Sequence, residues 1–245
     1  MRSYHSSHCT SRGPMASSHH NKVYRSAVLF DLDGTLHDRA QGILGFASNQ
    51  YSRLGTDQTQ CERYVSRFIE LDANGMVWKD QVYQILSDEF ELTDKPSVAA
   101  LVDEYIRLYP KFAAEISGAH DALVNLKEHG LKLGIVTNGR TDLQHAVIET
   151  LGFDLVVDAV VVSEEAGFRK PQRQIFEAAL ELLGVDASNS VMVGDSLKSD
   201  VEGALVAGIQ PIAFRLPSAP VGVTICHTMP EVVHAARLKI NTPKV

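Results

Sequence analysis

The sequence predicts an α/β fold with a doubly wound parallel sheet as its core and a block of helices inserted after the first strand. A buried strand, Ala27 to Phe30, ends abruptly at Asp31 in a polar, glycine-containing loop. Between residues 40 and 115 the apolar residues follow helical spacing alone. After Gly118 the pattern alternates between helix and strand, which is typical of a parallel sheet with crossover helices.

The inserted block is expected to hold four helices. Their apolar residues recur at helical spacing over residues 44–54, 64–69, 82–90 and 98–106. Gly55 ends the first helix, and Pro96 and Pro110 bracket the last one. We expect Trp78 and the other aromatic residues of the block to form its core, and not a stacking platform.

The remaining elements belong to the sheet and its crossover helices. Buried strands are expected at residues 133–136, 156–162 and 191–193, and edge strands at 209–214 and 223–225. Helical spacing covers residues 122–126, 143–151, 175–183, 201–205 and 229–238. Gly130, Gly184 and Gly208 stand where three of these helices should end.

Composition limits the classes of function. The chain has 245 residues, of which 44% are hydrophobic and 22% charged, as in an ordinary globular protein. The formal net charge of -7 argues against a nucleic-acid partner, whereas a local cation could still hold a small anionic substrate. No apolar run approaches the ~20 residues of a membrane-spanning helix. We expect a soluble protein that binds neither nucleic acid nor membrane, as a monomer or homodimer.

Residues 1–22 stand apart, with abundant Ser and His and no apolar stretch of the kind that a signal peptide needs. We expect them to be a disordered leader or a segment added for expression, and Met15 could be the natural start. The cysteines, Cys9, Cys61 and Cys226, are too scattered for a zinc site and odd in number for a disulfide framework. Reduced cysteines predict a cytoplasmic location.

Polar residues follow the predicted strands, and ligands of open α/β sheets bind outside the carboxyl ends of strands. The residues that should meet there are Asp31, Asp33, Thr35, Thr137, Asn138, Lys170, Asp195 and Asp200. Crowded carboxylates repel one another unless a cation compensates, so a divalent metal is expected. Oxygen ligands suit Mg²⁺, with Asp31 and Asp195 as direct ligands.

These motifs resemble those of the haloacid dehalogenase superfamily, in its phosphatase branch with an α-helical, C1-type cap. The resemblance runs from about Val28 to Phe214, and the helical block falls where that family inserts its cap. It implies a Rossmann-like catalytic core of residues 23–39 and 116–245 and a helical cap domain of residues 40–115. The matching segments are Asp31-Leu32-Asp33-Gly34-Thr35-Leu36, Thr137-Asn138, Lys170-Pro171 and Gly194-Asp195-Ser196 with Asp200.

The resemblance implies Mg²⁺-dependent hydrolysis of a small phosphorylated metabolite in two steps. Asp31 would take the phosphoryl group, while Asp33 would protonate the leaving oxygen and then activate water. The Asp33 backbone carbonyl would join Asp31 and Asp195 around the metal. No nucleotide or organic cofactor is implied.

The same resemblance gives roles to the other motif residues. Thr137, the Asn138 backbone and Lys170 would bind the phosphoryl oxygens, and Lys170 would also offset charge on the nucleophile. Thr35 and Asp200 would support the metal ligands from behind, with Asp200 holding a water or orienting Lys170. Whether Asp200 contacts the metal directly is left open.

Other functions fit parts of the pattern. A 5′-nucleotidase of the same family, a phosphomutase, a 2-haloacid dehalogenase and a non-catalytic sensor of phosphorylated ligands are the alternatives. Dehalogenases of this family lack an acid/base aspartate at the position of Asp33, so Asp33 favours phosphate chemistry. A calcium loop is excluded because its twelfth position, counted from Asp31, is Gly42 and not glutamate.

Several residues beside the motifs have plainer interpretations. His37 and Asp38 suit a solvated linker, and Arg140 suits a helix-start arginine that faces water. Asp200 could also be a residue of a first helical turn that Ser199 caps.

Overall fold

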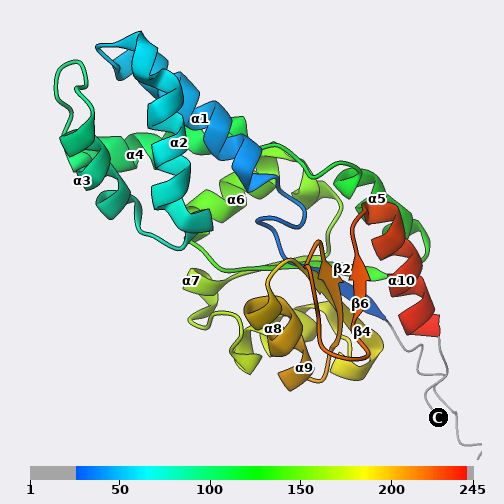
Figure 1. Cartoon of the computed structure of the whole chain (residues 1–245). Coiled ribbons are helices and arrows are strands. Elements are labelled where there is room, and N and C mark those ends of the chain that lie inside the picture. Colours follow the sequence, from blue (N-terminus) through cyan, green and yellow to red (C-terminus); the bar gives the residue numbers. More distant parts are fainter. Residues whose placement is uncertain (1–25, 242–245) are drawn as a thin grey trace, which may run out of the picture.

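A six-stranded sheet forms the core of the computed structural model, which describes residues 26–241 (Figure 1). Its order is β3-β2-β1-β4-β5-β6, and every neighbouring pair is parallel. The predictions for residues 1–22 and for Cys9 lie outside the described residues. The strands are β1 (Ala27–Phe30), β2 (Lys132–Thr137), β3 (Ala159–Val162), β4 (Ser190–Gly194), β5 (Gln210–Phe214) and β6 (Thr224–Cys226).

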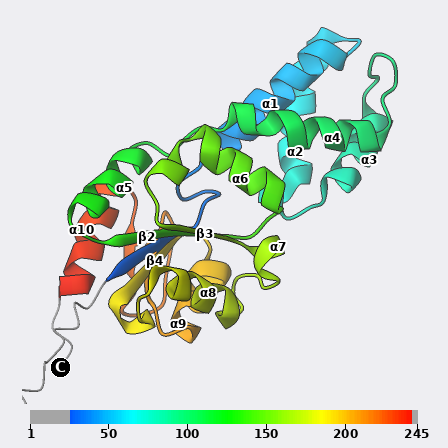
Figure 2. The same ribbon diagram turned by 180° about the vertical axis from the view of Figure 1, so that it is seen from behind.

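Side chains of the strands alternate between two apolar layers, because successive residues point to opposite faces of a sheet. Val28 and Phe30 of β1 pack in one layer with α5 (Ala119–Glu128) and α10 (Met229–Asn241). Ala27 and Leu29 pack in the other layer with α8 (Arg173–Leu183) and α9 (Gly203–Val206). Figure 2 shows these helices on opposite sides of the strands. The predicted doubly wound α/β core is confirmed.

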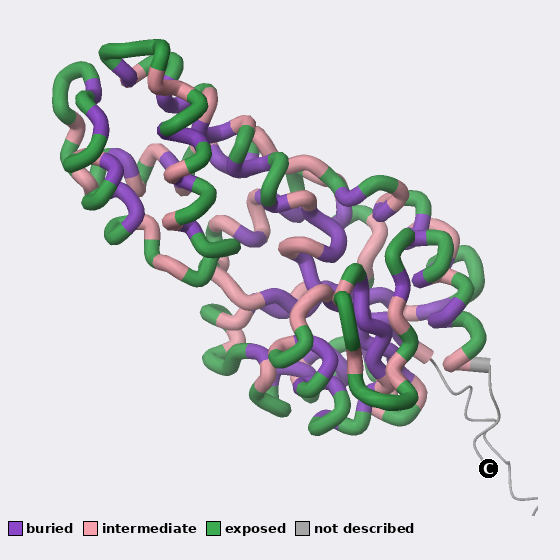
Figure 3. Tube along the Cα trace, in the orientation of Figure 1, coloured by how far each residue is buried: buried purple, intermediate pink, exposed green. Residues whose placement is uncertain are grey.

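Four helices form the inserted block, which extends away from the sheet in Figure 1. They are α1 (Arg39–Leu54), α2 (Cys61–Asp72), α3 (Lys79–Glu89) and α4 (Val98–Leu108), with short 3-10 turns at Gln58–Gln60, Ala73–Gly75 and Tyr109–Phe112. No strand occurs among residues 40–115, all of which are described. Figure 3 shows buried stretches along the helices of the block. Most aromatic residues of the block are buried as predicted: Phe46, Tyr51, Tyr64, Phe68, Tyr83, Phe90, Tyr105 and Tyr109.

Trp78 does not join this aromatic core. Its side chain is 68% exposed, so the expectation that it packs inside the block is wrong. Trp78 is the residue before α3 and adopts an extended backbone (ψ 141°), so it lies outside the helical register that buries Val82 and Leu86. A single tryptophan in a turn carries no periodicity from which its burial could be inferred.

The two connections between the block and the sheet run side by side. The Asp38 N–H donates to Ala114 O at 2.7 Å, and the Ile116 N–H donates to Leu36 O at 2.8 Å. His37, on the first connection, is fully buried, and its Nδ1 donates to Ala114 O of the second connection at 2.9 Å. The prediction of a solvated linker is therefore wrong for His37. Asp38 instead caps α1 by accepting a hydrogen bond from the Gln41 N–H.

Two strands differ from the prediction. β3 begins at Ala159 and not at residue 156, because the N–H groups of Val156 and Val157 donate to Phe153 O and close a 3-10 turn. A continuous apolar run carries no marker for that turn. β5 lies between β4 and β6, so the prediction of an edge strand is wrong for β5 and correct for β6.

The remaining helical elements lie between strands along the chain. These are α6 (Thr141–Thr150), α7 (Ser163–Ala166), 3-10 turns at Phe153–Leu155 and Ala187–Asn189, and a π-helical turn at Leu197–Glu202. Within residues 26–241, no helix is both long enough and apolar enough to cross a bilayer. Cys61 and Cys226 are free thiols, as expected.

Candidate active site

Three carboxylates meet at the carboxyl ends of two neighbouring strands. Asp31 follows β1, while Asp195 and Asp200 follow β4, and β1 pairs directly with β4. One oxygen from each carboxylate lies within 4.8 Å of the others. Hydrogen-bonded parallel strands end at one edge of the sheet, so residues 164 or more positions apart in the chain become neighbours.

Two glycines make this close approach possible. A Cβ at Gly34 would lie 2.0 Å from Asp195 Oδ2, and Gly34 has a φ of +85°, which side chains other than glycine rarely adopt. A Cβ at Gly194 would lie 2.3 Å from Asp200 Cγ. The absence of a side chain at Gly34 therefore lets Asp195 lie against the loop that carries Asp31, and its absence at Gly194 lets Asp200 lie against the end of β4.

Lys170 joins two of the carboxylates. Its Nζ donates to Asp31 Oδ1 at 2.5 Å and to Asp200 Oδ1 at 2.7 Å, and all three side chains are buried. Burial alone would lower the pKa of Lys170, but Asp200 and Asp31 outweigh it and raise that pKa above its ordinary value. Asp200 Oδ2 also accepts the Ser196 N–H at 3.0 Å. Asp200 thus fixes the position of Lys170 beside Asp31.

Crowding changes the acidity of the carboxylates. Burial raises the pKa of Asp31 well above its usual range, with Asp200 and Asp195 adding to the effect and Lys170 opposing it. Burial and the charge of Asp200 raise the pKa of Asp195 to about 6. Three carboxylates meet one lysine here, so the cluster holds more negative charge than Lys170 compensates. A set of oxygen donors with excess negative charge fits a hard divalent cation.

Polar residues of the loops hold this arrangement in place. Thr35 Oγ1 donates to Asp31 Oδ2 at 3.3 Å. The Asn138 side chain accepts the Lys170 N–H at 2.8 Å and donates to Lys170 O at 3.1 Å, which ties the loop after β2 to the loop that carries Lys170. Thr137 is buried at the end of β2, one residue before Asn138.

Asp33 faces a different set of partners. Gln144 Nε2 donates to Asp33 Oδ2 at 3.1 Å, and Arg39 NH1 lies 3.7 Å from the same oxygen. Asp33 Oδ1 is buried and has no hydrogen-bond partner among the described residues. His37 Nε2 lies 3.9 Å from it. The side chain of Asp33 therefore points towards the helical block, which supplies Arg39, and towards α6, which supplies Gln144.

Sequence reasoning did not single out Gln144 or Arg39 as site residues. Gln144 shares the buried face of α6 with Val147 and Ile148 at i+3 and i+4, so a glutamine on an otherwise apolar face was the available signal. Gln144 Nε2 also donates to Asn138 O at 3.1 Å. No comparable pattern marks Arg39, because its partners come from other helices.

Two smaller predictions are settled by the loop geometry. The residue that caps the turn containing Asp200 is Ser196, whose Oγ accepts the Ser199 N–H at 3.2 Å, so the expectation of a Ser199 cap is wrong. Arg140 is exposed and paired with Asp142, as the plain interpretation expected.

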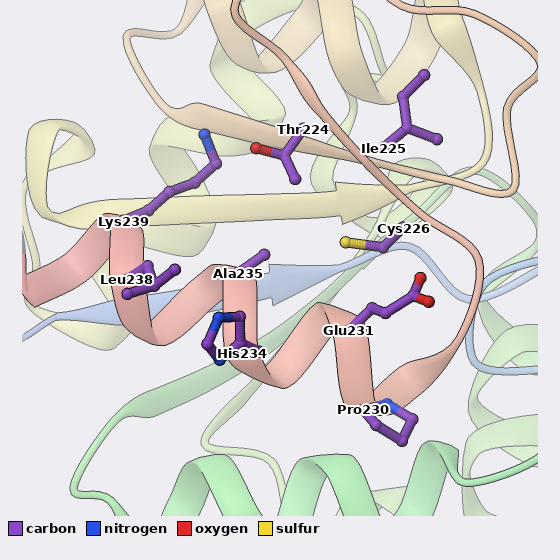
Figure 4. A pocket seen from close by; sticks show the side chains of 9 residues that line it. All are labelled: Thr224, Ile225, Cys226, Pro230, Glu231, His234, Ala235, Leu238 and Lys239. Carbon is purple, nitrogen blue, oxygen red and sulfur yellow. The ribbon is translucent and has the colours of Figure 1, made fainter.

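A groove of about 520 Å³ lies elsewhere, between β6 and α10 (Figure 4). Cys226, His234 and Lys239 are among its lining residues, and none of the motif residues is. The chemistry that the motifs predict therefore belongs to the carboxylate cluster and not to this groove.

Comparisons with known proteins agree with the arrangement. A family model described as haloacid dehalogenase-like hydrolase matches residues 28–214. Ribulose-1,5-bisphosphate 5-phosphatase of Halopiger xanaduensis is 34% identical over 201 residues, which cover 77% of this chain and 84% of that protein. Glyceraldehyde 3-phosphate phosphatase of Methanothermobacter thermautotrophicus is 32% identical over 194 residues, covering 76% and 84%.

The fold also matches solved structures. The hydrolase YfnB of Bacillus subtilis superposes with a TM-score of 0.68 at 24% identity, covering 87% of this chain and 99% of that one. This match extends over the sheet and the helical block.

Proposed function

Because the chain belongs to the haloacid dehalogenase-like hydrolase family and its named relatives are phosphatases, we propose that it hydrolyses small phosphorylated metabolites with Mg²⁺. The observation that carries this proposal is the contact of Lys170 with Asp31 and Asp200 beside Asp195. Asp31 is a buried carboxylate and can act as a nucleophile. Lys170 compensates its negative charge.

The reaction proceeds in two steps. In the first, an Asp31 oxygen attacks phosphorus, the bond from phosphorus to the ester oxygen breaks, and Asp33 gives that oxygen a proton. In the second, Asp33 takes a proton from water, whose oxygen attacks phosphorus and releases Asp31 and inorganic phosphate. Lys170, Thr137 and the Asn138 backbone offset or bind the charge on the phosphoryl oxygens throughout.

Mg²⁺, when bound, supplies positive charge that balances the carboxylates and the phosphoryl oxygens. The residues that would hold it are Asp31, Asp195 and the backbone carbonyl of Asp33. The oxygens of Asp200 are engaged by Lys170 and the Ser196 N–H, which supports a positioning role for Asp200 behind the metal ligands. Thr35 supports Asp31 in the same way.

The helical block is the cap of this enzyme in the same proposal. Residues 40–115 would cover the leaving group and exclude water, while residues 23–39 and 116–245 would form the catalytic core. The hydrogen bonds from the Asp38 N–H to Ala114 O and from the Ile116 N–H to Leu36 O support this division, since the chain leaves the sheet and returns to it at one place. The cytoplasmic location and the oligomeric state stay predictions of the sequence.

The test is phosphate release from a panel of sugar phosphates, nucleoside monophosphates and an artificial aryl ester, with Mg²⁺ or with a chelator. We expect release that the chelator abolishes. Asp31→Asn should lower it by at least about 10³-fold, because the amide is a far weaker nucleophile. Exposed Asp154→Asn is the matched control and should retain full activity. Normal turnover by a folded Asp31→Asn protein, checked by circular dichroism, would exclude Asp31 as nucleophile.

A further inference from the structure

Beside the proposed acid/base lies a buried ionic network of the helical block. Arg39 NH2 donates to both carboxylate oxygens of Asp72, at 3.0 and 3.1 Å, and Lys79 forms an ion pair with the same carboxylate. The side chains of Arg39, Asp72 and Lys79 are 7%, 4% and 12% exposed. They come from the start of α1, the end of α2 and the start of α3, so the network ties three helices together.

The network contains more positive than negative charge whenever Asp33 is protonated. Asp72 offsets one of the two cations, and Asp33, whose Oδ2 forms an ion pair with Arg39 NH1 at 3.7 Å, offsets the other while it is ionised. When Asp33 carries the proton that the proposed function has it give to the leaving oxygen, this second offset is absent. Arg39 Nε is buried and has no hydrogen-bond partner within the described part of the chain. Burying an uncompensated charge is costly, so an excess cation with an unused donor marks a place that an anion can fill.

The electrostatics of Lys79 include repulsion between the two cations. Burial lowers the pKa of Lys79 below its ordinary value, Asp72 opposes the shift, and the like charge of Arg39 adds to it. Burial also acts on Asp72, but Arg39 and Lys79 outweigh it and lower the pKa of that carboxyl. An anion placed near both cations would relieve their mutual repulsion.

The loop between α2 and α3 is built around the same carboxylate. Ala73, Asn74 and Gly75 adopt left-handed backbone conformations, with φ of 44°, 55° and 80°. The Gly75 N–H donates to Asp72 Oδ2 at 2.8 Å, and a Cβ at Gly75 would lie 3.0 Å from Arg39 Cζ. Asp72 therefore fixes the loop that leads to Lys79, so that both cations are held in place before a ligand arrives.

The network lies beside the place where the leaving group of the substrate would depart. Figure 1 shows the start of α1 and the end of α2 on the side of the block that faces the sheet. Asp33 protonates the leaving oxygen in the proposed function, so the group attached to that oxygen departs beside Arg39. We propose that Arg39 and Lys79 bind a second anionic group on the leaving part of the substrate. The preferred substrates are then phosphomonoesters whose alcohol carries a carboxylate or a second phosphate.

This inference rests on the proposed function, and substrates of matched length separate the two. Glycerol 1-phosphate has a neutral leaving group, 3-phosphoglycerate has a carboxylate, and propane-1,3-diol bisphosphate has a second phosphate. The measured quantity is kcat/KM for each, expressed as a ratio to that for glycerol 1-phosphate. We expect a ratio well above one for at least one of the two anionic leaving groups, and the larger of the two ratios distinguishes a preference for carboxylate from one for phosphate.

Lys79→Met keeps most of the length of the side chain and removes its charge. It should lower that ratio by about 10- to 100-fold, the loss expected for one charge-assisted hydrogen bond. Lys79→Arg, which keeps the charge, should retain most of the ratio. Lys95→Met removes an exposed lysine of the same block and is the matched control, with an unchanged ratio.

Ratios near one in the wild-type protein, or an equal fall in kcat/KM for all three esters in Lys79→Met, would overturn the inference while leaving the phosphatase proposal intact. The second result would mean that Lys79 only supports the structure of the block. Absence of phosphate release from every ester, in Mg²⁺ with the protein folded, would instead reject the proposed function and the inference with it.

Discussion

Glycine at position 34 decides whether two carboxylates can share one site. Its φ of +85° strains any other residue, and a Cβ there would collide with the Asp195 carboxylate. A side chain at this position would displace Asp195, which is proposed to hold the metal. The geometry of the site thus depends on the absence of a Cβ atom at Gly34.

We predict that Gly34→Ala lowers phosphatase activity by at least about 100-fold, since a misplacement of about 1 Å can cost that much. Gly130→Ala is the control, because Gly130 also has a positive φ, +78°, but has no atom within 4 Å of its Cβ position. It should lose about 1 kcal/mol of stability and retain its activity. Activity assays and urea unfolding of both variants test this, and similar activity of the two would contradict it.

Residues in short local motifs are easier to predict from the sequence than residues whose partners are distant in the chain. Asp31 and Lys170 lie in short motifs that follow a strand or precede a helix, so local pattern suffices to find them. His37 bonds to Tyr109, 72 positions away, and Gln144 bonds to Asp33, 111 positions away. No local pattern contains such partners.

Among the elements, the helices of the inserted block share a buried polar centre. Gln50 of α1 accepts the hydroxyl hydrogens of Tyr64 at 2.9 Å and Tyr83 at 3.1 Å, and donates to Glu104 at 2.8 Å. These partners come from α2, α3 and α4. Burial raises the pKa of both tyrosines above the ordinary value, so their hydroxyls remain donors.

We predict that Gln50→Leu destabilises the protein by about 2 to 4 kcal/mol, because two tyrosine hydroxyls and a glutamate lose their buried partner. Gln84→Leu, on an exposed position of α3, should change the free energy of unfolding by no more than about 0.5 kcal/mol. Denaturant unfolding measures both. A Gln50→Leu protein as stable as Gln84→Leu would show that the shared amide contributes nothing to the block.

Across the whole molecule, the carboxylate cluster couples stability to pH. The pKa of Asp195 is about 6 in the folded protein against 3.8 for an ordinary aspartate. Between these values the folded state binds more protons than the unfolded state, so the free energy of unfolding of the metal-free protein falls as pH rises. Asp31, whose pKa is also raised by burial, contributes with the same sign.

Other carboxylates contribute with the opposite sign. Lys127 and Lys132 outweigh burial and lower the pKa of Asp158 to about 2, so its stabilising contribution is lost only as pH falls towards that value. The dependence of Tm on pH therefore contains contributions from both kinds of carboxylate. The change in Tm on adding Mg²⁺ separates them, because Asp158 is outside the cluster.

We predict that Mg²⁺ raises Tm more at about pH 7.5 than at about pH 5, since protons compete with the metal for the raised carboxylates. Thermal unfolding with Mg²⁺ and with a chelator at each pH measures the difference. Asp195→Asn should remove most of it, and exposed Asp154→Asn should not. An equal rise in Tm at both pH values would contradict the coupling of metal binding to these carboxylates.

The sequence by itself determined the parallel α/β core, the inserted helices and the motifs that follow the strands. Hydrophobic periodicity and turn residues are local, and parallel strands bring their carboxyl ends to one edge. Only the tertiary structure decided that His37 is buried, that Trp78 is exposed, and that β5 lies inside the sheet. Only the tertiary structure likewise brought Arg39, Asp72 and Lys79 beside Asp33. Burial and charge pairing depend on residues that are distant in the chain, and helical spacing carries no information about which neighbour will cover a side chain.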